Sequence, residues 1–256
     1  MTNKEILRIA MEQSALDLNC SPDDFMRNDH VVVVNSKLGP SAKKYYKEPI
    51  TCFFVSYGSN IVASVKEEYH DIAAEYINKF EHSHCFRTPN IHWLDEKLAE
   101  KGQKVCFMAE YFLPDINKLR PLPCDYEMSI LDPPDFADLY RPEWRNALTE
   151  SRRELDMLGV GAYDGDRLIG LAGCSADCER MWQIGVDVLP EYPKRGISAA
   201  LTSRLAIEVL KRGKVPFYCC AWSNIRSAGN AVKSGLVPAW AEMTVMPKEM
   251  VDELNR

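Results

Sequence analysis

The sequence lacks the features typical of membrane, secreted and nucleic-acid-binding proteins. No apolar run approaches the ~20 residues that span a bilayer, and the opening residues MTNKEILRIAMEQ contain no secretory hydrophobic segment. With 31 Lys and Arg against 37 Asp and Glu, the net charge is −6, without the basic excess of a nucleic-acid binder. We therefore expect a cytoplasmic protein without nucleic-acid or membrane partners, its oligomeric state left open.

Histidine is absent after residue 92. The five histidines are His30, His70, His82, His84 and His92. The rest of the chain therefore has no local histidine for Ser-His or Cys-His chemistry. The nine cysteines are scattered and odd in number, which is typical of reduced thiols. EHSHCFRTPNIH could ligate a metal through His82, His84, Cys85 and His92, but its irregular spacing favours surface polar residues. Cys174 and Cys178 lie close enough to suggest a metal corner, but no second cysteine or histidine pair lies near them in sequence, and the prediction is no metal.

Proline is concentrated in one segment, FLPDINKLRPLPCDYEMSILDPPDF. The prolines in it are Pro114, Pro121, Pro123, Pro133 and Pro134. Neither a helix nor a central strand tolerates this density. The segment predicts a domain boundary near residues 114–124, with an N-terminal α/β domain at 1–122 and a second domain at 123–256.

Apolar periodicity predicts the elements within each domain. In the first, helices are expected at 3–18, 66–80 and 90–101, and strands in HVVVVN, ITCFFVSYGSNIVASV (a hairpin turned at 57–60) and KVCFMAEYFL. In the second, the expected order is the strand DYEMSILD, helical structure over 135–156, a hairpin turned at 164–166, the strand MWQIGVDVL, a helix from near 198 to 211, the strand VPFYCCAW, a short helix at 227–234 and the strand AWAEMTVM.

The segment DVLPEYPKRGISAALTSRLAIEVLKRG, residues 187–213, joins a strand to a long helix through a loop with two cations and a glycine. The free N–H groups of a helix N-terminus, together with nearby cations, favour a bound anion. The segment matches neither G-x-x-x-x-G-K-[ST] nor G-x-G-x-x-G, which argues against a nucleotide triphosphatase and a Rossmann dehydrogenase. An ordinary turn capped by Ser198 is the alternative that needs no ligand.

The order of elements over residues 125–247 resembles the GNAT acyltransferase superfamily. PKRGIS corresponds to the phosphate signature of that family, with Gly196 kept, proline at the first position and serine at the last. WSNIRSAGNAVKSGL, ending in KSGL, corresponds to its second signature. The resemblance implies an α+β fold with a mixed sheet, GNAT-like in the C-terminal half, and acetyl-CoA as co-substrate.

The resemblance also implies which residues hold coenzyme A. Main-chain groups of the strand before the loop would pair with pantetheine, and loop N–H groups would bind the pyrophosphate. The Asn224 amide would reach the pantetheine arm, a role that can coexist with capping the following helix. The implied cofactor-binding residues are Val186, Val188, Lys194, Arg195, Gly196, Ile197, Ser198, Ala199, Asn224 and Ser227.

The usual catalytic groups of the family are missing from their expected positions. Many relatives have a tyrosine acid where this chain has Ala231, and the strand before the loop begins without a carboxylate. Asp187 is the candidate catalytic base, and a polar residue facing a helix is its alternative role. Glu150 and Glu154 are further candidates, with solvated surface positions as their alternative.

The expected function is transfer of an acetyl group from acetyl-CoA to an amine of a small molecule or peptide by direct attack. A catalytically silent acyl-CoA-binding or regulatory module is the alternative. The segment LYRPEWRNALTESRRELDML, expected to line the acceptor pocket, contains Trp144, Arg145, Arg152 and Arg153. Two or more inward-pointing arginines would favour an acceptor with a carboxylate beside its amine over a polyamine, and solvated arginines are the alternative.

A faint repeat links the two halves. EKGQKVCFMAEYFLP and KSGLVPAWAEMTVMP both run from a glycine through a strand to a proline, from Gly102 to Pro114 and from Gly235 to Pro247. We predict that residues 1–120 form a degenerate GNAT-like half without a cofactor, with chance similarity as the alternative. The run Lys66-Glu67-Glu68 supports the loss, because its carboxylates would repel a phosphate at that helix start.

Overall fold

The chain folds into two compact units, and neither is a single continuous segment. The computed structural model describes residues 1–34, 36–192 and 195–256. One unit, which we name the 111–238 unit, also contains residues 1–9, and the 10–110 unit also contains residues 239–256. The predicted boundary at 114–124 lies near the first crossing. The second crossing was not predicted, because strand β10 (Leu236–Pro247) continues from one unit into the other without a break.

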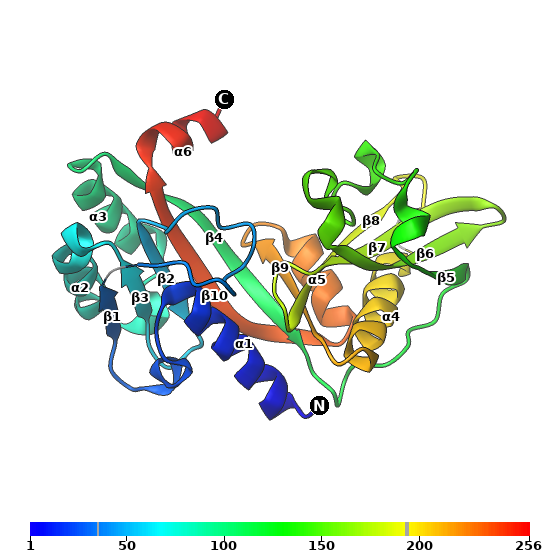
Figure 1. The fold of residues 1–256 in the computed structure, drawn as a ribbon, viewed down its shortest axis with the longest axis horizontal. Coiled ribbons are helices and arrows are strands. Elements are labelled where there is room, and N and C mark those ends of the chain that lie inside the picture. Colours follow the sequence, from blue (N-terminus) through cyan, green and yellow to red (C-terminus); the bar gives the residue numbers. More distant parts are fainter. Residues whose placement is uncertain (35, 193–194) are drawn as a thin grey trace. The chain divides into compact units, whose positions relative to one another are not determined.

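The 10–110 unit contains a small sheet with helices packed against it (Figure 1). Its elements are α1 (Asn3–Leu18, which begins in the other unit), β1 (Val31–Val34), β2 (Cys52–Ser56), β3 (Val62–Val65), α2 (His70–Lys79), α3 (Thr88–Ala99), the first part of β4 (Gln103–Pro114), the end of β10 and α6 (Lys248–Leu254). β1 pairs parallel with β3, whereas β3 and β10 pair antiparallel with β2. The predicted helices and strands of this region are present, and α6 is an addition.

A buried group of charges stabilises the 10–110 unit. The Lys43 side chain is 2% exposed, and its Nζ lies 3.0 Å from Asp17 Oδ2 and 3.1 Å from Glu242 Oε1. Trp240 Nε1 donates to the same Glu242 oxygen at 2.8 Å. Because an unpaired buried charge costs several kcal/mol, these contacts hold the end of β10 to α1 and to the loop that carries Lys43.

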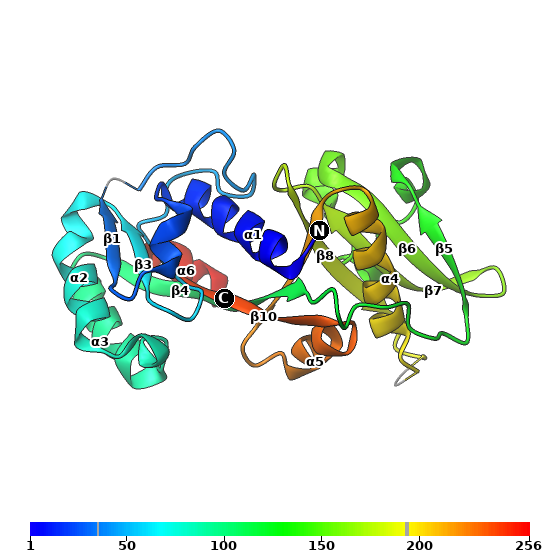
Figure 2. The same ribbon diagram turned by 90° about the horizontal axis from the view of Figure 1, so that it is seen from below.

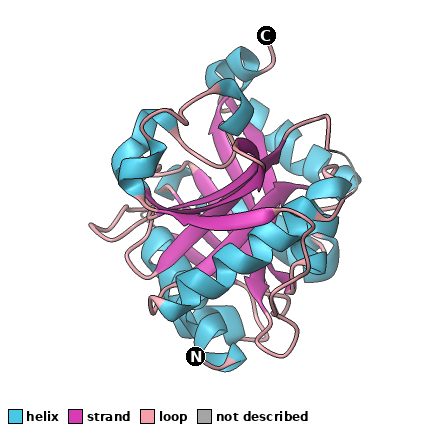
Figure 3. Ribbon diagram, turned by 90° about the vertical axis from the view of Figure 1, so that its right-hand side faces the viewer, coloured by secondary structure: helices cyan, strands magenta, loops and turns pink. Residues whose placement is uncertain are grey.

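The 111–238 unit contains a mixed sheet with the long helix α4 on one face (Figure 2). Its elements are β5 (Glu127–Leu131), β6 (Asp156–Asp164), β7 (Arg167–Ser175), β8 (Met181–Val188), α4 (Ile197–Lys211), β9 (Val215–Ala221) and α5 (Ile225–Lys233). Strands β5 to β8 pair antiparallel in sequence order, and β9 pairs parallel with β8. Strands bordered by helices are visible in Figure 3, and the predicted α+β class is confirmed.

The predicted helical structure over residues 135–156 is wrong. The chain instead forms three short 3-10 turns, at Pro133–Phe136, Pro142–Trp144 and Glu150–Leu155, the last interrupted at Arg152 (φ −146°, ψ 44°). The N–H groups of Asn146 and Ala147 donate to the side chain of Asp187 and so are not available to an α-helix.

The repeat predicted between the halves is present locally. β4 and β10 each follow a glycine with positive φ, Gly102 at +66° and Gly235 at +93°, and each has 12 residues. The strand orders differ, however. In the 111–238 unit the parallel partner β9 follows α4 in sequence, whereas in the 10–110 unit the parallel partner β1 precedes the hairpin β2–β3. The two units thus share the glycine-strand pattern but differ in strand order, and the hypothesis that one is a degenerate copy of the other stays a prediction.

Candidate functional site

Strands β8 and β9 pair only over their first residues. Their ladder joins Met181 to Val215, Trp182 to Pro216 and Gln183 to Phe217, and no further pair joins them in the described part of the chain. β8 continues to Val188 and β9 to Ala221. We name the space between residues 184–188 and 218–221 the β8/β9 notch. It offers a strand edge that an extended ligand can use for hydrogen bonds.

The alternation of β8 decides which backbone groups face the notch. Leu189, which directly follows β8, donates its N–H to the carbonyl of Ile169 in β7 at 2.9 Å. The register between β7 and β8 is regular from 183 to 188. Because backbone groups of successive residues point to opposite edges of a strand, Asp187 faces β7, whereas Val186 and Val188 face the notch. These two residues are the ones that the sequence predicted for pantetheine.

The loop after β8 leads into an uncapped helix N-terminus. Gly196 is the N-cap of α4, with φ +73°, and no side chain caps this end. Ser198 lies inside the helix, so the predicted alternative of a Ser198 cap is wrong. Within the described residues, Ala200 is the one residue of the first turn whose N–H has a helical partner, the Gly196 carbonyl, at 3.0 Å. The amides of Ile197, Ser198 and Ala199 thus form a positive end suited to an anion.

Arg195 is fixed beside this helix end. Its Nη1 donates to Tyr126 Oη at 2.6 Å, and the Tyr126 ring packs edge-on against Tyr192. Tyr126 was not predicted as a site residue, because no local pattern connects it to a loop seventy positions later. Lys194, the other predicted cation, lies outside the described residues. The loop therefore contributes one exposed guanidinium group to the helix end.

Three further residues lie on β9 and α5. Asn224 caps α5 by accepting the Ser227 N–H at 3.2 Å, which is the structural role considered for it, and it is exposed. Ser227 Oγ lies 2.7 Å from Tyr218 Oη. Tyr218 is the first residue of β9 after the last pair with β8, and burial raises its pKa, so its hydroxyl stays protonated at neutral pH.

Asp187, the predicted catalytic base, holds a loop. Its Oδ2 accepts the N–H groups of Asn146 at 2.8 Å and of Ala147 at 3.0 Å. Its Oδ1 accepts the Asn146 side-chain amide at 2.6 Å. Both carboxylate oxygens are thus occupied, and the loop carrying Asn146 lies directly on β8.

Two glycines allow this close contact. A Cβ at Gly185 would lie 1.7 Å from the Asn146 carbonyl oxygen, and one at Gly173 would lie 2.1 Å from that of Ala147. The two glycines are paired across β7 and β8, so they form one smooth patch on the sheet. Any side chain at this patch would displace the loop.

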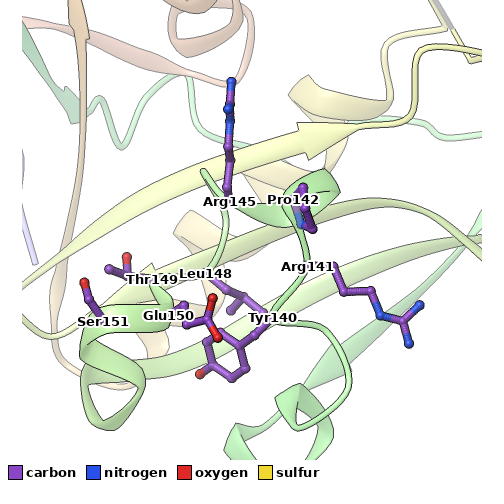
Figure 4. Close-up of a pocket in the computed structure, with 8 residues that line it drawn as sticks. All are labelled: Tyr140, Arg141, Pro142, Arg145, Leu148, Thr149, Glu150 and Ser151. Atoms are coloured by element: carbon purple, nitrogen blue, oxygen red, sulfur yellow. The ribbon is translucent and has the colours of Figure 1, made fainter.

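The loop encloses a pocket of about 480 Å³, within the range of small-molecule sites (Figure 4). Its lining residues are Tyr140, Arg141, Pro142, Arg145, Leu148, Thr149, Glu150 and Ser151. Glu150, a candidate base, forms an ion pair with Arg153 at 2.7 Å, and Arg152 forms one with Asp177. Trp144 is buried against the sheet. The pocket therefore has mixed polar and apolar walls beside β8.

A buried carboxyl group supports the pocket wall. Asp156 is 2% exposed, and its Oδ2 accepts from Tyr140 Oη at 3.1 Å and from the Thr149 N–H at 3.0 Å. Its Oδ1 has no hydrogen-bond partner among the residues that the structure describes. Burial raises the pKa of Asp156 to about 6. The sequence did not indicate this residue, because its burial depends on the fold of the loop.

Comparison with known proteins finds similar structures but no sequence family. No family model and no curated protein matches the chain. A GCN5-related N-acetyltransferase-like protein from Streptococcus suis is 20% identical, with TM-score 0.44, over 60% of this chain and 67% of that protein. A GNAT-family acetyltransferase from Colwellia psychrerythraea is 13% identical, with TM-score 0.45, over 78% and 82%. A tandem GNAT protein from the clavulanic acid pathway is 12% identical, with TM-score 0.41, over 63% and 59%.

The glycine patch can be tested by adding one methyl group. Gly185→Ala should lower the free energy of unfolding by about 1–3 kcal/mol, because the new Cβ overlaps the Asn146 carbonyl. Gly229→Ala in α5 is the control, since a Cβ there meets no atom within 4 Å. Urea unfolding measures both variants, and hydrogen exchange over 142–149 should increase only in the first. Equal stability of the two variants would contradict the packing described.

The raised pKa of Asp156 predicts a pH-dependent stability. Between about pH 4 and 6 the folded state holds a proton on Asp156 that the unfolded state has lost, so stability falls as pH rises. The contribution is at most about 3 kcal/mol, from a shift of 3.8 to about 6. In Asp156→Asn this fall should disappear, as urea titrations from pH 4 to 7 would show. Exposed Asp138→Asn is the control, and an unchanged pH profile in Asp156→Asn would refute the assignment.

Proposed function

We propose that the chain is a GNAT-type N-acyltransferase that moves an acetyl group from acetyl-CoA to an amine. The observation that carries this proposal is the β8/β9 notch, which opens after Gln183 and Phe217 and leads into the uncapped start of α4. A ligand with an extended chain and terminal phosphate groups fits this combination. Its chain can form hydrogen bonds to the strand edge, and its phosphates can bind at the helix N-terminus.

The parts of acetyl-CoA are assigned to residues by the same reasoning. The pantetheine amides would pair with the backbone of Val186 and Val188, whose polar groups face the notch. The pyrophosphate would lie at the N–H groups of residues 196–199, with Arg195 adding positive charge. Asn224 would contact the pantetheine arm with its amide while its carbonyl caps α5. The thioester would then lie where β9 separates from β8.

The chemistry is direct attack of the amine on the thioester carbon. A C–N bond forms, the C–S bond breaks and the attacking nitrogen loses a proton to water. The departing thiolate takes a proton from the Tyr218 hydroxyl, which Ser227 holds in place at 2.7 Å, and water returns a proton to the tyrosinate. Many members of the family that the chain resembles have a tyrosine acid on α5, at the position of Ala231, which is fully buried here. Tyr218 would take the role of that acid. Asp187 would act by positioning the loop, because both of its oxygens are occupied.

A catalytically silent acyl-CoA-binding module is the second candidate. It is favoured by Ala231 at the usual acid position and by the occupied carboxylate of Asp187. Both candidates predict CoA binding, so binding alone does not separate them. CoA release measured with acetyl-CoA and a panel of amines does: turnover of any amine excludes the silent module.

The phosphate site can be tested at Gly196. Gly196→Asp should lose CoA binding, because it places a negative charge in the anion site, whereas Gly196→Asn should retain most of it. Both side chains tolerate the left-handed backbone at φ +73° better than most. A Cβ here meets no atom within 4 Å, so neither variant should unfold.

Calorimetry with CoA and acetyl-CoA measures the difference between these two variants. If the wild type binds neither CoA nor acetyl-CoA at millimolar concentration, the proposed function is wrong. Equal affinities of the aspartate and asparagine variants would show that the anion lies elsewhere.

The assigned acid can be tested by Tyr218→Phe. This change keeps the ring that packs against Phe112 and removes only the hydroxyl. We expect kcat to fall about 100-fold or more, the usual effect of losing a general acid, with KM for acetyl-CoA nearly unchanged. Steady-state kinetics measures both constants. An unchanged kcat would mean that water or another group protonates the thiolate.

A further inference from the structure

The loop over β8 carries four arginines with two different environments. Arg152 is paired with Asp177, and Arg153 is paired with Glu150 and stacks on the Tyr140 ring at 4.1 Å. In the described residues, the side chains of Arg141 and Arg145 have neither an ion pair nor a hydrogen bond, and both line the pocket. The pocket therefore has two uncompensated positive charges at its rim, since its one carboxylate is neutralised by Arg153.

Arg145 lies at the border between the pocket and β8. It precedes Asn146, whose backbone is fastened to Asp187 and touches Gly185. In Figure 4 its side chain points away from Tyr140, Leu148 and Glu150, whereas that of Arg141 leaves the pocket in a different direction. Because the contacts of Asn146 fix the backbone next to Arg145, the guanidinium group of Arg145 can reach only positions near this part of β8.

We propose that Arg145 selects an acceptor that carries an anionic group, most simply a carboxylate, near its reactive amine. This proposal rests on the proposed function, and it names the substrate class of the same site. The amine must reach the thioester at the β8/β9 notch, and the loop with Arg145 is bound to the same strand residues, 185 and 187. An anion attached close to the amine therefore falls within reach of the Arg145 guanidinium.

The charges also exclude a competing class of acceptor. A polyamine would bring two or more positive charges to a pocket whose rim already carries Arg141 and Arg145. The positive charges of the polyamine and of these two arginines would repel each other. Glu150 would not compensate, because it is already paired with Arg153. An amino-acid-like acceptor brings a compensating charge instead, and a planar guanidinium binds a carboxylate through two parallel hydrogen bonds.

The test compares matched acceptors on matched variants. The probes are the common amino acids, their carboxamides and spermidine, each assayed for CoA release with acetyl-CoA. For the wild type we expect turnover of at least one amino acid with a KM at least tenfold below that of its carboxamide. Arg145→Gln should raise the amino-acid KM by about 10- to 100-fold, the size of a charge-assisted hydrogen bond, and leave the carboxamide KM unchanged. Arg145→Lys should restore part of the difference.

Arg204→Gln, on α4 away from the pocket, is the control and should not change either KM. Equal KM values for acids and carboxamides, a preference for spermidine, or an Arg145→Gln effect that is the same on both probes would overturn the proposal. Acceptor binding is also measured by calorimetry in the presence of CoA. CoA binding without any turnover would overturn the transferase function. If amino acids then still bind more tightly than their carboxamides, and Arg145→Gln loses this difference, the proposed role of Arg145 is supported. No acid-selective binding overturns the pocket itself.

Discussion

The contact between Asp187 and the loop at Asn146 and Ala147 is the interaction on which the candidate site depends. One carboxylate accepts two backbone N–H groups and a side-chain amide, so the loop needs no helix to satisfy its polar groups. Gly173 and Gly185 let the loop carbonyls approach the sheet more closely than any side chain would allow. The pocket, the position of Arg145 and the wall formed by Tyr140 all follow from a loop held flat against β8.

The second constraint is the early end of the ladder between β8 and β9. A parallel pair that separates after three residues leaves backbone groups without strand partners on that edge, a state that proteins tolerate where water or a ligand takes their place. The N-terminus of α4, which has no side-chain cap, adds N–H groups that have no partner among the described residues. In the proposed complex, one elongated anionic ligand would be a hydrogen-bond partner for both sets of groups.

The sequence predicted those features that depend on neighbours along the chain. The strands around β8 and the long helix α4 follow from periodicity, and the glycine before the helix follows from the PKRGIS loop. The left-handed conformation of Gly196 is an addition from the structure. What failed depends on distant partners. The 135–156 segment has a helix-like apolar pattern, but Asp187, some forty residues later, takes its N–H groups. Likewise, the burial of Asp156 and the crossing of β10 between units depend on tertiary packing that no local pattern encodes.

Strand β8 shows why these functions can coexist within a few residues. Its odd-numbered side chains face the loop, where Gly185 gives room and Asp187 gives hydrogen bonds. Its even-numbered side chains pack toward α4, as the contact expected between a Cβ at Gly170 and Val188 indicates. The backbone groups of those even residues point instead to the notch. Side chains and backbone groups alternate along a strand with the same period of two. The residues of β8 whose side chains face the loop therefore turn their backbone groups to β7, whereas those whose side chains face α4 turn theirs to the notch.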